Sequence, residues 1–179
     1  MTETTIYSRE EIIAALEEVS LNLIKLISEQ DAVKFMVATE NKWSTAQQLD
    51  HLTRSIKQLE LILSKPHFIM KLLFGTANRA TRNYKTVVEK YNIKLEQGAT
   101  TTGQYVPKPS ANSNKKKMLD NFARKSEKLE RIINRYKEND LDRYVLPHPL
   151  LGKLTIREMM FFTIHHIKHH TDATKKQYT

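Results

Sequence analysis

The sequence predicts an all-α fold, namely a four-helix bundle, from three observations. Four segments carry narrow apolar seams at helical spacing. No stretch alternates convincingly between apolar and polar residues, and only four glycines and five prolines are available for the turns of an all-β fold. Such seams are typical of helices that pack against one another as a bundle. The length of 179 residues favours a single domain over residues 1–179.

The first two main helices each begin with a capping box, in which Ser8 pairs with Glu11 and Ser44 pairs with Gln47. The first seam comprises Ile12, Leu16, Val19, Leu23 and Leu26. The second seam comprises Leu49, Leu52, Ile56, Leu59 and Leu63. Pro66 is expected to end the second helix, because proline has no backbone N–H to donate.

The third and fourth main helices lie in the C-terminal third of the chain. The third begins near Ser113, and Lys125 interrupts its apolar seam. That seam comprises Met118, Phe122, Leu129, Ile132, Ile133 and Tyr136. The fourth begins at Thr155, which forms a capping box with Glu158, and runs through a histidine-rich segment almost to the end of the chain.

The connection between the second and third main helices is long. We expect a shorter helical piece at 81–95, after Gly75. Residues 96–114 are rich in Thr, Ser, Gly, Pro and Asn and form a long loop within the domain. A loop of this length in a compact domain is either mobile or covers a site.

Composition excludes several classes of protein. The absence of cysteine removes disulfides and thiolate ligands, so any bound metal would be held by nitrogen and oxygen. No apolar run is long enough to span a bilayer, and we expect a cytoplasmic protein without a membrane partner. The net charge of +9 raises the question of nucleic acid. Most basic residues alternate with acidic ones, as in "KSEKLERIINRYKEND", which is typical of solvated helix faces and argues against nucleic-acid binding.

Four of the seven histidines fall within six positions, in "TIHHIKHHTDA". With each helical residue turning by about 100°, His170 and His166 lie roughly 40° and 80° from Ile156, inside or beside the apolar arc of the fourth helix. His165 and His169 point outward. The pair at i and i+4 could bring both rings to one ion, or the two could be core histidines bonded to their neighbours. The spacing leaves these alternatives open.

The other histidines are less clearly placed by periodicity. His51 lies roughly 120° from the centre of the second seam, at its flank, which is not a core position. His67 follows Pro66 at a helix end, and His148 lies in a turn-rich segment before the fourth helix. Either of the last two could be a surface residue.

Two segments together resemble a known family. "WSTAQQLDHLTRSI", followed far downstream by "HPLLGKLTIREMMFFTIHHIKHH", is similar to the DinB/YfiT-like metal-binding proteins of the DinB superfamily. The resemblance covers nearly the whole chain and implies a four-helix bundle. It also implies that a histidine of the second helix joins an H-x-x-x-H pair of the last one around a divalent metal. By position, these ligands are His51, His166 and His170.

The resemblance implies one divalent ion, zinc or nickel first, with iron or manganese as further candidates. Three protein ligands leave coordination positions open, as in catalytic rather than structural zinc sites. The resemblance implies a metal-dependent enzyme of hydrolase or thiol S-transferase type, in which a bound water or substrate thiolate would supply the nucleophile. Its partner would be a small molecule or a low-molecular-weight thiol, and the protein could form a homodimer. The alternative is a non-enzymatic bundle that binds a metal or ligand in a stress response.

Some further residues carry expectations of their own. His148 and Tyr105 are candidates for the substrate side of the site, and the pair Tyr105 and Lys108 in the long loop could close over a pocket. Trp43 is expected to be a staple residue at the start of the second helix. Relatives often place Gln three residues after the last histidine, where this chain has Ala173, so any role of that amide is vacant or reassigned.

Overall fold

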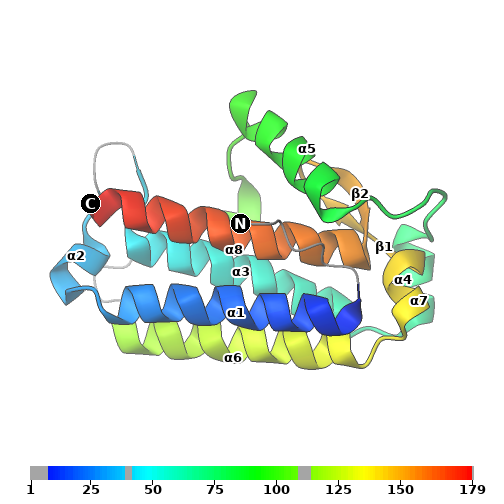
Figure 1. Cartoon of the computed structure of the whole chain (residues 1–179), viewed down its shortest axis with the longest axis horizontal. Coiled ribbons are helices and arrows are strands. Elements are labelled where there is room, and N and C mark those ends of the chain that lie inside the picture. Colours follow the sequence, from blue (N-terminus) through cyan, green and yellow to red (C-terminus); the bar gives the residue numbers. More distant parts are fainter. Residues whose placement is uncertain (1–7, 39–41, 109–113, 179) are drawn as a thin grey trace.

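The structure is a computed structural model that describes residues 8–38, 42–108 and 114–178. Its architecture is the predicted four-helix bundle (Figure 1). The four main helices are α1 (Arg9–Ser28), α3 (Thr45–Leu63), α6 (Lys115–Asn134) and α8 (Ile156–Tyr178). Among the described residues, no helix combines the length and apolar character needed to cross a membrane.

The bundle helices form a closed ring of neighbours. α1 packs against α6 and α8, and α3 packs against the same two helices. Contacts at the helix ends give the directions: the Arg9 side chain bonds the Tyr136 carbonyl, so α1 and α6 are antiparallel. The Tyr136 hydroxyl donates to the Leu63 carbonyl at 2.8 Å, so α3 and α6 end at the same side of the bundle. The start of α3 lies beside the last turns of α8, since Gln48 contacts His170.

The predicted capping boxes at Ser8 and Ser44 are present, and α6 begins after Asn114, which caps it, while Ser113 lies outside the described residues. One seam position was wrong. In α1 the last core contact is made by Ile27, which is fully buried, and Leu26 is only half-buried. A continuing spacing of four suits the helical turn better here than the spacing of three that the pattern suggested.

Lys125, which interrupts the apolar seam of α6, has a partner inside the bundle. Its ammonium lies 3.0 Å from the carboxylate of Glu60, which is buried on α3, and Lys128 reaches the same oxygen at 3.2 Å. A buried carboxylate is tolerated only when it is paired. The interruption is therefore an ion pair between two helices rather than a break in the packing.

Shorter elements join the main helices. They are α2 (Ala32–Met36), α4 (His67–Phe74), α5 (Tyr84–Glu96), the 3₁₀ turn η1 (Gly103–Tyr105) and α7 (Glu138–Arg143). α5 matches the helical piece expected at 81–95, and it lies across α8 outside the bundle (Figure 1). α2, α4, η1 and α7 were not predicted. α4 ends at Gly75, whose φ of 86° is in the left-handed region that glycine adopts without strain.

A short β-hairpin precedes α8 and was also missed. β1 (Val145–His148) pairs with β2 (Gly152–Thr155) in antiparallel register, with Val145 opposite Thr155. In β1 the first two residues are buried, and in β2 the last two are buried. The side chains of each strand therefore do not alternate between core and solvent. A strand this short, with Pro147 inside it, leaves no period-two pattern to find.

The hairpin leads directly into α8 through Thr155 and Glu158. The expected capping box is present: the Thr155 N–H donates to Glu158 at 3.0 Å, and the Glu158 N–H donates to the Thr155 hydroxyl at 3.2 Å. Glu158 is fully buried and also accepts hydrogen bonds from Arg79 and Arg82. The start of α8 is thus held by charges from the segment between α4 and α5, and this fixes where its later turns lie.

Candidate metal centre

α8 presents its histidines as the helical wheel predicts. His166 and His170 face the bundle and are 5% and 9% exposed. His165 is half-buried and lies 3.3 Å from the side-chain oxygen of Asn92 on α5, and His169 is exposed. The apolar arc of α8 packs against α1 and α3, and that packing turns the inner pair toward α3.

His51 is more deeply buried than its position on the α3 seam predicts. It is only 5% exposed, although periodicity placed it at the flank and not in the core. The difference arises because η1, in the long loop, packs on that flank of α3. The described part of the expected loop, up to residue 108, therefore covers a site, which was one of the two roles expected for the loop of residues 96–114.

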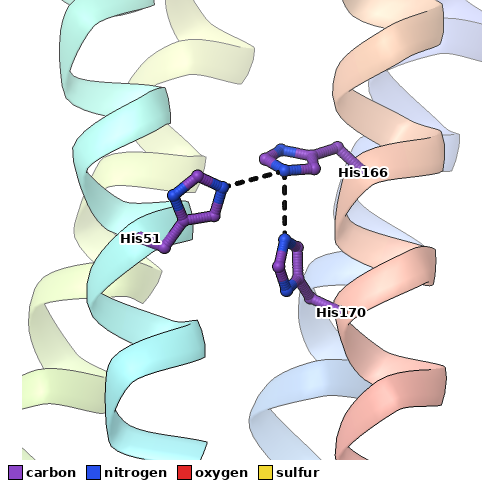
Figure 2. Close-up of side chains that lie close together, drawn as sticks. All are labelled: His51, His166 and His170. Carbon is purple, nitrogen blue, oxygen red and sulfur yellow. Dashed lines mark hydrogen bonds between the residues drawn. The ribbon is translucent and has the colours of Figure 1, made fainter. Parts of the chain in front are cut away.

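Three imidazole nitrogens converge between the two helices (Figure 2). The Nε2 of His166 lies 3.0 Å from the Nε2 of His51 and 3.1 Å from the Nε2 of His170. One nitrogen from each ring falls in a group whose members are all within 4.8 Å of one another. Nitrogens bound at 2.0–2.1 Å to one tetrahedral ion are about 3.3 Å apart, so the separations of 3.0 and 3.1 Å are near those around a shared ion.

Two of the rings have their tautomer set by the groups behind them. The Nδ1–H of His51 donates to the carbonyl oxygen of Tyr105 at 2.8 Å, and the Nδ1–H of His170 donates to Oε1 of Gln48 at 3.2 Å. The amide of Gln48 is oriented in turn, since its Nε2 donates to the Trp43 carbonyl at 3.4 Å. His51 and His170 consequently turn unprotonated Nε2 lone pairs toward His166. Such contacts orient metal-binding histidines in proteins.

The ring of His166 cannot satisfy both neighbours by itself. A neutral ring nitrogen offers either one N–H or one lone pair, in one direction. Facing two lone pairs, the Nε2 of His166 donates to one of them at most, and the other contact stays unfavourable. A single cation among the three nitrogens removes the conflict, because it accepts a lone pair from each ring.

The electrostatics of the cluster favour neutral rings. Burial lowers the pKa of His51, and burial together with the neighbouring imidazoles lowers the pKa values of His166 and His170 well below their ordinary range. Neutral imidazole is the form that binds metal. In donor chemistry, tautomer and protonation state, the residues fit a divalent ion.

Trp43 shields one side of the cluster. Its ring stacks on His170, with 5° between the planes and 6.2 Å between the centroids, and its centroid lies 5.1 Å from that of His51. The staple expected at this position would pack on the fourth residue of the helix after the cap, which is the polar Gln48. Trp43 instead contacts the histidine rings, so the staple interpretation was incomplete.

A cavity of about 120 Å³ opens beside the histidines, and His51 and His166 form part of its wall. Both substrate-side candidates, His148 and Tyr105, line it as well. Lys108 does not, since its side chain is exposed and its backbone N–H donates to Asp50 at 3.0 Å. The expectation that Lys108 closes over a pocket was therefore wrong.

The remaining candidates lie away from the site. Asp50 next to His51 is paired with Arg54 at 2.7 Å. His67 stacks on Tyr136 at the far end of the bundle, with 4.9 Å between ring centroids. Ala173, where relatives often have Gln, is half-buried. Sequence reasoning missed Gln48, although its spacing of three from His51 on one helix already places it on the same face.

The site and the fold together agree with the comparison against known families. The model of the DinB superfamily matches residues 7–172. The chain belongs to the DinB superfamily. No curated protein matches this DinB-superfamily chain in sequence.

Two solved structures resemble this DinB-superfamily protein in fold. TT2238, described as a four-helix bundle protein, aligns with a TM-score of 0.59 and 15% identity, over 94% of this chain and 99% of its own. The colibactin self-resistance protein ClbS, solved in complex with a dsDNA, aligns with a TM-score of 0.54 and 14% identity, over 95% of this chain and 94% of its own. Identities this low carry the fold and no more.

Proposed function

We propose that this DinB-superfamily protein is a metal-dependent enzyme of hydrolase or thiol S-transferase type. Its single divalent ion would be held by His51, His166 and His170. The observation that carries the proposal is the convergence of three Nε2 atoms. Those of His51 and His170 lie 3.0 and 3.1 Å from that of His166, and both turn a lone pair toward it. Neutral imidazoles in this arrangement satisfy at most one of the two contacts with a hydrogen bond, and a cation would accept the lone pairs that remain.

The donor set narrows the choice of ion. Three imidazoles suit zinc and nickel best here, and iron or manganese remain candidates, since selection in cells also depends on metal supply. Three protein ligands leave room for a further ligand, as catalytic sites do. When bound, such an ion makes water or a thiol a better nucleophile at neutral pH.

The protein's own residues hold and shield this site. The Tyr105 carbonyl and the Gln48 amide fix the orientation of two ligand rings, and Trp43 covers them on one side. The cavity next to His51 and His166 is where a substrate would bind. A substrate bound there would lie beside two of the three proposed ligands.

Metal analysis of protein made without a histidine tag tests the site. We expect close to one divalent ion per chain in the wild type, and a loss of that ion in His51→Ala, His166→Ala and His170→Ala. His165→Ala is the matched control, because His165 lies on the same helix outside the cluster. Retention of the ion by the three variants, or its loss from the control, contradicts the assignment.

Turnover separates an enzyme from a protein that only binds. We expect hydrolysis of an ester or transfer to a thiol by the metal-loaded protein, with the activity lost in the same three variants. Stoichiometric metal without turnover across a panel of esters, amides and thiol acceptors would favour the non-enzymatic alternative, a metal- or ligand-binding stress protein. The homodimer expected from the sequence stays a prediction that light scattering can test.

Binding of duplex DNA is a second candidate function. The net charge of +9 and the complex of the structural neighbour ClbS with a dsDNA both favour testing it. Contacts to phosphate release counterions, so affinity for a duplex should fall steeply as salt increases. A titration of the protein with duplex DNA at several salt concentrations decides the question, because the absence of measurable binding at low salt removes this candidate.

A further inference from the structure

The cavity beside the histidines has an unusual wall. Charged residues make up 27% of the chain, yet none lines this cavity among the residues that the structure describes. Its polar groups are the histidines, two tyrosines, a few hydroxyls and the amide of Gln58. A charged group of a ligand would find no ion-pair partner there.

The floor of the cavity is apolar. α3 contributes Leu52, Ile56 and Leu59, and α8 contributes Met159, Phe162 and Ile167. The volume of about 120 Å³ is comparable to that of the apolar cavity of about 150 Å³ that binds benzene in an engineered protein. The space therefore suits a group the size of one ring or of a short branched chain.

His148 lines the cavity, and the turn behind it fixes the tautomer of its ring. The backbone N–H groups of Leu150 and Leu151 both donate to its Nδ1, at 3.1 Å each. Nδ1 must therefore carry the lone pair, and the proton sits on Nε2. Burial also lowers the pKa of His148 to about 4, so the ring is neutral at pH 7. His148 consequently has an N–H to donate at Nε2, and its Nδ1 is not free to act as a base.

We propose that the part of the substrate inside this cavity is uncharged and mainly apolar, and that it carries an oxygen acceptor to which His148 donates. An ester, amide or ketone of a small apolar molecule has this chemistry. The inference rests on the proposed function and sharpens it by assigning the substrate class. The inference also limits which low-molecular-weight thiol could be the co-substrate. A thiol that had to place its own charged groups inside the cavity would bind weakly.

The physical reason is the cost of desolvation. A charged group moved from water into a wall without counter-charges loses hydration that nothing replaces. The metal ion would supply the one strong charge of the site, and it acts on the atom it coordinates, not on groups held against the leucines of α3. Neutral groups lose little on entry and gain from apolar contact.

The test uses a series of ligands that share an acetyl-substituted ring. On the metal-loaded protein, titration calorimetry compares para-methylacetophenone with its cationic isostere para-acetyl-N-methylpyridinium and with para-acetylbenzenesulfonate, an anion that coordinates metals weakly. We expect the neutral ketone to bind at least about ten-fold more tightly than either ion. Equal or tighter binding of an ion would overturn the proposal.

A variant that adds a charge provides the reciprocal test. Gln58 lines the cavity, whereas Gln97 is exposed at the end of α5 and does not. Gln58→Arg should strengthen binding of the sulfonate by about ten-fold or more, because the anion then has a partner. Gln97→Arg, which adds the same charge elsewhere, should leave it unchanged. An equal gain in both variants would mean that overall charge, not the cavity, sets the preference.

The role of His148 is tested with His148→Asn. An asparagine oxygen can accept from the backbone N–H groups of the turn, so the hairpin is kept while the imidazole Nε2–H is removed. We expect affinity for para-methylacetophenone to fall about five-fold. Affinity for para-ethyltoluene, which lacks the oxygen, should stay within two-fold. A parallel fall for both ligands, or no change for either, contradicts the donor role.

Failure of this inference is distinguishable from failure of the proposed function. Metal content is measured on the same samples, and the three aromatic probes need no metal to enter the cavity. If the protein holds no metal, the enzyme proposal fails while the preference for neutral ligands is still measured on metal-free protein. If metal is present and the charged probes bind as well as the ketone, only the substrate class is wrong.

Discussion

Two buried polar clusters lie on the same helix and differ in how their groups are satisfied. At the start of α8, Glu158 is fully buried and accepts from Arg79, Arg82 and two backbone N–H groups. Two to three turns later, His166 and His170 are also buried, but with His51 they form a cluster of neutral rings whose lone pairs face one another. The chain supplies every partner of the first cluster, whereas the second leaves at least one ring lone pair without a donor from the chain.

This difference separates structural from functional polar groups. A buried charge with all its partners supplied by the chain stabilises one geometry and has no capacity left for a ligand. Buried lone pairs that converge without a donor are costly to the folded protein unless something else binds. Burial alone does not tell a structural cluster from a functional one, because both clusters are buried. The balance of hydrogen-bond donors and acceptors distinguishes them.

The largest expected effect is on the complete cluster. Burial by itself would raise the pKa of Glu158, but the hydrogen bonds from Arg79 and Arg82 and from backbone N–H groups outweigh it and lower the pKa from 4.5 to about 2. Glu158→Gln should therefore cost about 3 kcal/mol of unfolding free energy at pH 7. Urea unfolding measures it.

The pH dependence gives the sign of this effect. Because the folded-state pKa of Glu158 is depressed, its contribution is complete above about pH 4.5 and is lost as the pH falls toward 2. The gap between wild type and variant should close over that window, while the metal content of the folded variant at pH 7 is unchanged. Glu127→Gln is the control, since this carboxylate forms an exposed pair with Arg131 and should change stability by less than about 0.5 kcal/mol. Equal stability of Glu158→Gln and wild type would contradict the claim that the Glu158 cluster stabilises the fold, and with it the difference between the two clusters.

The second expected effect comes from completing the histidine cluster. A metal that binds only the folded state at 100 times its Kd adds about 2.7 kcal/mol to the unfolding free energy. His166→Phe should gain nothing from the metal. Without metal, the same variant should stay within about 1 kcal/mol of wild type, because it removes a nitrogen that lacked a full set of partners. Unfolding with and without zinc measures both values, and a loss of several kcal/mol in the metal-free variant would show that the cluster is already complete.

The smallest effect concerns the groups behind the ligands. Gln48→Leu leaves the Nδ1–H of His170 without its acceptor and frees the ring to turn. Metal affinity should fall about ten- to a hundred-fold, as is usual for the loss of a group that orients a ligand. Competition with a chelator measures the affinity, and the exposed Gln97→Leu is the control. An unchanged affinity in Gln48→Leu would mean that packing alone orients His170.

Much of the fold followed from local patterns. The capping boxes at Ser8, Ser44 and Thr155 marked helix starts correctly, because a cap uses only residues within one turn. The hairpin before α8 could not be found this way, because its strands are four residues long and its side chains do not alternate. α2, α4 and α7 are also short and depend on contacts with the bundle more than on their own propensity.

The site was predicted unevenly for a related reason. The inward pair His166 and His170 followed from the period of the helix, whereas the burial of His51 did not, because it depends on η1 packing from a distant part of the chain. Gln48 and the Tyr105 carbonyl came from the structure alone. A backbone carbonyl in particular carries no residue signature, so no reading of side-chain types could have named it.

The sequence by itself determined the four-helix bundle and which side of the last helix faces its core. Helical periodicity and capping depend on the order of a few neighbouring residues, so both can be recognised in the sequence. Helical periodicity did not place the third ring, which a family resemblance named, and only the tertiary structure showed that it meets the pair, that two lone pairs point inward, and that an uncharged cavity opens beside them. Those features depend on where separate helices and a long loop pack against one another, and hydrogen bonds between segments more than fifty residues apart have no local period from which to be read.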